Sequence, residues 1–125
     1  MFAETKLVTT ANIIADTHTG DPNNVIVLTS HTDSVLAGPG INDDGSGTVA
    51  LLTLASKLSM YNVKNAVRFI FCTAEEAGLI GSTYYGERAC RLNMVPQKLI
   101  PVCAVENLSQ SELSKIRMDL NFDML

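Results

Sequence analysis

The spacing of apolar residues along the chain changes several times, and each change predicts a different element. Residues 7–15 and 25–29 are apolar runs that we expect to form strands. The polar segment 16–24 between them (DTHTGDPNN) is rich in turn formers, so the two strands suggest an antiparallel hairpin. Residues 30–47 contain many Gly, Asp and Asn residues and few apolar ones, which is typical of a long loop.

The next segment has helical rather than strand periodicity. Leu51, Leu54, Ala55 and Leu58 recur every three or four residues, which predicts an amphipathic helix over residues 49–61. The polar end of the preceding loop contains Ser46, a residue type that can help to cap such a helix.

The remainder of the chain continues to alternate strand and helix. The nearly continuous apolar run 66–73 (AVRFIFCT) predicts a central strand that is covered on both faces. A second helix is expected from Ser82, and residues 109–112 (SQSE) have the spacing of a capping box before a last strand at 117–124. This alternation predicts a three-layer α/β/α domain with a mixed central sheet.

Composition narrows the class of protein. A chain of 125 residues suits one domain, and its 46% apolar and 18% charged residues are typical of a soluble globular protein. The net charge of −4, with nine scattered Lys and Arg residues, argues against nucleic-acid binding. No apolar run approaches the ~20 residues that a membrane span needs, and residues 1–10 do not resemble a signal peptide.

Four residues and one segment leave questions open. We expect Cys72 to pack as a small buried residue, whereas the disulfide state of Cys90 and Cys103 is undecided. Asn107 begins a glycosylation sequon, which matters only in a secretory pathway. Residues 89–106 contain two prolines and no clear period, so we expect an inserted or irregular loop.

Polar clusters follow three of the predicted strands. They are the segment from His31 to Asp33, the Glu75-Glu76 pair, and Asp123. Ligands in layered α/β sheets bind at the carboxyl ends of the strands, so the topology is expected to bring these residues to one edge.

Each cluster alone also has an ordinary structural interpretation. The segment 40–47 (GINDDGSG) could be a plain turn, the two glutamates could be solvated, and a single histidine is usually structural. Together they offer one imidazole and several carboxylates. Such donors suit zinc, and a shared carboxylate allows two ions ~3.5–4 Å apart.

The motifs resemble those of the co-catalytic two-zinc aminopeptidases, in particular the fungal aminopeptidase Y type. The resemblance runs from about Thr9 to Arg88 and resumes at Asn107. Four blocks carry it: HTDSV at 31–35, GPGINDDGSG at 38–47, TAEEAGLIGS at 73–82 and LNFDM at 120–124.

The resemblance implies a role for each matching position. His31 and Asp123 would bind the first zinc, Asp43 would bridge both ions, and Glu76 would bind the second. Glu75 would be the general base. The resemblance further implies that Asp33 orients His31, and it makes the peptide bond after Asp43 a candidate for the cis form.

The resemblance also implies a substrate and a location. The substrate would be a peptide with a free N-terminus, the parent proteins are secreted or vacuolar, and no nucleic-acid or membrane partner is expected. Rival hypotheses are a related zinc exopeptidase or glutaminyl cyclase, and a metal-poor non-catalytic domain that self-associates through an uncovered sheet edge.

One departure from the family concerns the second zinc. Its remaining ligand in the family is a histidine well past the strand of Asp123, whereas this sequence ends at Leu125 and its other histidine is His18. We therefore expect residues 1–125 to form a single partial catalytic domain whose C-terminal part is missing. Zinc occupancy is expected to be one ion or partial, and activity weak or absent.

Overall fold

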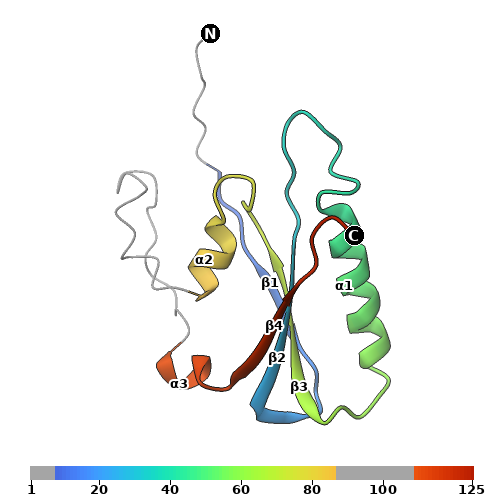
Figure 1. Ribbon diagram of the computed structural model, residues 1–125, viewed down its shortest axis with the longest axis vertical. Coiled ribbons are helices and arrows are strands. Elements are labelled where there is room, and N and C mark those ends of the chain that lie inside the picture. The colour runs from blue at the N-terminus through green and yellow to red at the C-terminus, as the bar shows by residue number, and fades with distance from the viewer. Residues whose placement is uncertain (1–7, 87–108) are drawn as a thin grey trace.

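The structure, a computed structural model, describes residues 8–86 and 109–125 (Figure 1). They form a four-stranded sheet in the order β1-β3-β2-β4. β1 is antiparallel to β3, whereas β2 is parallel to both β3 and β4, so the predicted mixed sheet is confirmed. The strands are β1 (Ile13–Asp16), β2 (Asp21–His31), β3 (Asn65–Cys72) and β4 (Ile116–Asn121).

The predicted hairpin between the first two strands is wrong. β1 and β2 are not neighbours, because β3 lies between them and bonds to both. β3 is the strand with apolar residues on both faces, and a central position buries both of them. Backbone bonds from Thr17 N–H to Val67 and from Asp21 N–H to Lys64 hold the intervening turn against the start of β3. β1 itself begins at Ile13, later than the apolar run suggested.

Helices cover the two faces of the sheet (Figure 1). On one face, Leu51 of α1 (Gly45–Leu58) packs with Leu28 of β2 and with Val67, Phe69 and Phe71 of β3. On the other face, Tyr85 of α2 (Ile80–Gly86) packs against Val27, Ile70 and Cys72. The alternating residues of β2 and β3 therefore supply two cores, as expected for a layered α/β domain.

The helix termini differ in detail from the predicted ones. α1 begins at Gly45 because the Asp44 carboxylate accepts the Gly47 N–H and caps the helix. Ser46, the expected cap, instead donates its hydroxyl to the Asn42 carbonyl. α2 begins two residues before Ser82.

The short helix α3 (Gln110–Leu113) has the predicted capping box. The Glu112 carboxylate accepts the Ser109 N–H at 2.9 Å, and Ser109 Oγ accepts the Glu112 N–H at 3.2 Å. β4 then ends at Asn121, so Asp123 lies just beyond the strand. The predictions for residues 89–106, which include Cys90 and Cys103, and for Asn107 lie outside the described residues. Among the helices of the described segments, none has the length and apolarity to cross a bilayer.

Candidate metal centre

The carboxyl ends of the three parallel strands bring the predicted site residues together. His31 ends β2 and pairs in register with Cys72, the last residue of β3. Asp123 follows β4, whose Asn121 pairs with Thr29 two residues before His31. The segments carrying Asp43 and Glu75 approach from the loops that follow β2 and β3.

His31 presents one ring nitrogen to these acids. Its residue surface is 3% exposed, and its Nδ1 lies 3.0 Å from the backbone carbonyl oxygen of Asp33. A carbonyl can only accept, so Nδ1 carries the proton and Nε2 keeps a free lone pair. Within the described part of the chain Nε2 has no hydrogen-bond partner, yet it is buried.

Three carboxylates surround this nitrogen. Nε2 of His31 lies 3.0 Å from Oδ1 of Asp43, 3.9 Å from Oε2 of Glu75 and 3.9 Å from Oδ1 of Asp123. Imidazole nitrogen and carboxylate oxygen are donors that zinc accepts. The buried oxygen Oε1 of Glu76 likewise has no partner among the described residues. A buried lone pair and a buried carboxylate oxygen without donors fit a bound cation.

The pKa values at the site show the same excess of negative charge. Burial lowers the pKa of His31, but the carboxylates of Asp44, Glu75 and Asp123 and the bond to Asp33 outweigh it, so the pKa is raised. Burial raises the pKa of Glu75; His31 opposes this, and Glu76 and the other nearby acids reinforce it. Bringing a cation to this site would relieve the repulsion.

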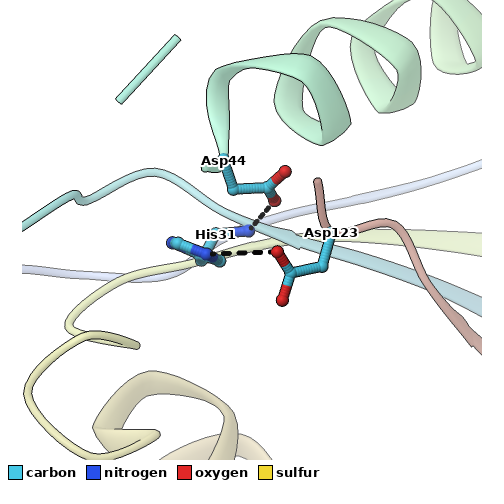
Figure 2. A group of neighbouring side chains, drawn as sticks. All are labelled: His31, Asp44 and Asp123. Carbon is cyan, nitrogen blue, oxygen red and sulfur yellow. Dashed lines mark hydrogen bonds and ion pairs between the residues drawn. The ribbon is translucent and has the colours of Figure 1, made fainter. Parts of the chain in front are cut away.

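The two adjacent aspartates have different surroundings. Asp44 is 2% exposed, and its two oxygens accept the His31 N–H and the Gly47 N–H, each at 2.9 Å. Figure 2 shows this bond reaching the backbone of His31, whereas Asp123 faces the imidazole. The Asp43 side chain is 44% exposed and points its Oδ1 at Nε2. The peptide bond between the two residues is cis, the form that the family resemblance implies.

His31, Asp44 and Asp123 do offer one ligand atom each within 4.8 Å of one another. Both Asp44 oxygens already accept a backbone N–H, that of His31 and that of Gly47. Asp43 therefore has the more available carboxylate for a metal bound at Nε2.

Asp33 links the histidine to the glutamates. Its backbone carbonyl, rather than its carboxylate, receives the Nδ1 proton; the carboxylate Oδ1 is 3.6 Å from Nδ1. The two carboxylate oxygens accept the N–H groups of Glu75 and Glu76 at 3.0 and 3.1 Å. One residue thus fixes the tautomer of the imidazole and the backbone that carries both glutamates.

Two other residues beside the site were not identified from the sequence. Asp44 is one, and its position before a helix in a segment rich in Asp and Gly is the signal that could have identified it as a cap. Thr48 is the other: its hydroxyl donates to the His31 carbonyl at 2.7 Å, a contact that no sequence pattern indicates. His18 is not part of the site, because it lies in the turn beside the start of β3, at the opposite end of the sheet.

Comparisons with known proteins identify the family of this chain. The model of peptidase family M28 matches residues 12–125, and the chain therefore belongs to this family. It is 53% identical over 117 residues to the probable leucine aminopeptidase 2 of Aspergillus oryzae and 47% identical over 117 residues to the leucine aminopeptidase 2 of Trichophyton rubrum. Each match covers 94% of this chain and 20% of the relative. The chain thus spans about a fifth of the length of these curated relatives.

Solved structures show the same fold. A zinc aminopeptidase from Bacillus subtilis superposes with a TM-score of 0.68 at 33% identity, covering 90% of this chain and 24% of that one. An aminopeptidase from Aneurinibacillus sp. strain AM-1 gives a TM-score of 0.68 at 34% identity, with the same coverage. The predicted zinc-exopeptidase-like α/β fold is thereby confirmed.

Proposed function

We propose that this chain supplies zinc-binding and proton-transfer groups for the hydrolysis of N-terminal residues from peptides. One observation supports this more than any other. The buried Nε2 of His31 has no hydrogen-bond partner in the described segments and faces the carboxylates of Asp43, Glu75 and Asp123. The relatives named above are aminopeptidases, which favours this reaction over those of other zinc exopeptidases or glutaminyl cyclases.

The proposed ligands follow the family resemblance. His31, Asp43 and Asp123 would hold one zinc ion, with Nε2 as the nitrogen donor. Asp43 would be shared with a second ion, to which Glu76 would contribute the carboxylate whose Oε1 is buried without a donor. Bound zinc would supply Lewis acidity toward a peptide carbonyl and toward a water molecule.

Glu75 is the proposed general base. Its Oε2 lies 3.9 Å from Nε2 of His31, at the edge of the proposed zinc site, and glutamate is one of the side chains that act as general bases. Its carboxylate would take a proton from the attacking water and pass it to the leaving amine. Asp33 would act as a positioning residue, because it holds the backbone N–H of Glu75 and the imidazole N–H of His31.

The substrate would be a peptide with a free amino terminus. The carboxylates at the sheet edge would attract a positively charged α-amino group. The names of the relatives favour leucine at the cleaved position.

The family resemblance also supports a secreted or vacuolar location. In a eukaryotic secretory host, Asn107 would then carry a glycan, and glycosidase treatment would shift the mass of the chain but not that of Asn107→Gln. A chain that reaches the medium or vacuole in both forms without this shift would leave the sequon without a role.

The hydrolysis of leucine anilide by the zinc-loaded chain tests the proposal. We expect cleavage, even if slow, of the free-amine substrate and none of its N-acetylated form. Glu75→Gln should lower the rate by ~10²–10⁴-fold, the usual contribution of a general base. The control variant Glu112→Gln, on the exposed helix α3, should cleave at the wild-type rate. Equal cleavage of both substrates, or a Glu75→Gln variant that cleaves as fast as the wild-type chain, would contradict the proposal for this chain.

A further inference from the structure

The loop between β3 and α2, residues 73–79, carries both glutamates and is closed at its base by the first turn of α2. The Gly81 N–H donates to the Thr73 carbonyl at 3.0 Å. The side chain of Asn12, just before β1, completes this closure from outside the loop. Its Oδ1 accepts the Thr73 N–H at 3.1 Å, and its Nδ2 donates to the Gly81 carbonyl at 2.7 Å.

The Asn12 amide therefore links the residue that follows β3 to the first turn of α2. It accepts an N–H from Thr73 and donates to the carbonyl of Gly81, beside the backbone bond that already joins these two residues. The fit is tight, since a Cβ on the buried Gly81 would run into the Thr73 backbone and into Oδ1 of Asn12. Only a side chain with both a donor and an acceptor can make these two bonds.

The other end of the loop is held by Asp33, whose carboxylate accepts the N–H groups of Glu75 and Glu76. The loop is thus fixed at its base by Asn12 and at its tip by Asp33. Residues 73–76 run between these two anchors, so we expect a change at the base to shift the segment that carries the glutamates.

We propose that Asn12 is a positioning residue that sets the placement of Glu75 and Glu76 at the metal centre. The importance of this placement for catalysis rests on the function proposed above. The placement itself does not, because it follows from contacts within the chain.

The test compares Asn12→Leu with Thr17→Val in the full chain. Thr17 is a matched control: its hydroxyl also accepts an N–H from β3, that of Val67 at 3.0 Å, and also donates to a carbonyl, that of Thr19 at 2.9 Å. It does so at the opposite end of β3 from the glutamates. Both variants lose one accepted and one donated bond, so both should lower the melting temperature to a similar extent.

The first readout is amide hydrogen exchange in zinc-free protein, which does not depend on the proposed activity. Asn12→Leu should accelerate exchange at the N–H groups of Glu75 and Glu76 by about tenfold or more, whereas Thr17→Val should not. Asn12→Asp, which keeps the acceptor and loses the donor, should give an intermediate effect and serves if the leucine variant does not fold. Unchanged exchange at both glutamates in the Asn12 variants, or equal acceleration in Thr17→Val, would overturn the proposal.

The second readout is zinc affinity, measured by competition with a chelator at a temperature where all variants are folded. Asn12→Leu should weaken zinc binding by ~10–100-fold, the range for residues that orient metal ligands, and Thr17→Val by less than about twofold. Accelerated exchange in Asn12→Leu, together with a wild-type chain that binds no zinc, would support the role of Asn12 and refute the proposed function, so the two failures are distinguishable. Equal affinities of the two variants would refute a role for Asn12 at the metal.

Discussion

At the scale of single residues, Asp43 and Asp44 are neighbours in sequence with separate tasks. Asp43 directs a carboxylate oxygen at the imidazole of His31, from a partly exposed position. Asp44 is buried and holds the backbone of His31 and the start of α1. The first geometry suits a ligand that must bind and release, and the second suits a structural acceptor whose removal leaves buried N–H groups unpaired.

Asp44→Asn should therefore destabilise the fold. An amide can accept one of the two N–H groups, but its own NH₂ would face the other, so a charge-assisted bond is lost and a buried donor is left unpaired. We expect a loss of ~2 kcal/mol in the free energy of unfolding, measured by urea denaturation.

Asp119→Asn is the control for this change. Asp119 is an exposed residue of β4, so replacing its carboxylate by an amide at neutral pH should change stability little. Comparable losses in the free energy of unfolding in both variants would indicate a general effect of removing an acidic residue, and not an effect of the specific bonds of Asp44.

The sequence predicts the residues with direct chemistry better than those that support them. His31, Glu75 and Asp123 stand out because each follows a strand, and parallel strands present their ends at one edge. Asn12 gives no such signal, because its partners are backbone groups about 60 to 70 residues away in the chain. Asp33 was expected to orient His31, but the sequence gives no sign that its carboxylate also accepts the N–H groups of the two glutamates.

At the scale of elements, the first turn of α1 packs directly against the segment that follows β4. Gly47 is buried, and a Cβ at this position would meet the Phe122 carbonyl oxygen and the Asp44 carboxylate. This contact holds Asp123, the next residue, beside the loop that carries Asp43.

Gly47→Ala should force these elements apart. We expect a loss of ~1–3 kcal/mol in the free energy of unfolding, as for overpacked sites, because the neighbouring atoms are backbone or already bonded. Gly38→Ala has nothing within 4 Å of the added Cβ and should change stability by less than ~0.5 kcal/mol. Thermal or urea denaturation of both variants would measure these changes. Equal stability of the two variants would show that the close packing of α1 against the segment after β4 does not stabilise the fold.

The capping box of α3 gives a prediction about pH. The backbone N–H of Ser109, followed by its hydroxyl, lowers the pKa of Glu112 below the ordinary value of 4.5. A lowered pKa in the folded state means that the cap stabilises α3 above pH 4.5 and loses this effect as the pH falls through the lowered pKa. In Ser109→Ala the Glu112 pKa should rise toward 4.5 in an NMR titration, and an unchanged value would show that the hydroxyl contributes nothing.

Local patterns predicted most elements of the described segments, but not the order of the strands. The helical spacing around Leu51 and the apolar run of β3 predicted α1 and β3 to within a few residues. The hairpin prediction failed because the turn formers in residues 16–24 are compatible both with two paired neighbouring strands and with two strands that a third strand separates. Only the need to bury both faces of β3 decides that β3 inserts between β1 and β2.

At the scale of the whole molecule, the strand order produces the site. β2, β3 and β4 are adjacent and parallel, so their carboxyl ends meet. The edge strand β4 exposes Met118 and Leu120 in the described part of the chain. Self-association through this edge stays a prediction, as does the partial occupancy of the second zinc.

Zinc binding by the chain is the most direct test of this account. Titration of the metal-free protein should show a zinc site, and His31→Gln should weaken it by at least ~10-fold, because Nε2 of His31 is the proposed nitrogen ligand. His18→Gln should bind zinc as tightly as the wild-type chain. A wild-type chain that binds no zinc, or a His31→Gln variant that binds it equally well, would contradict the central claim that the sheet edge around His31 is a zinc centre.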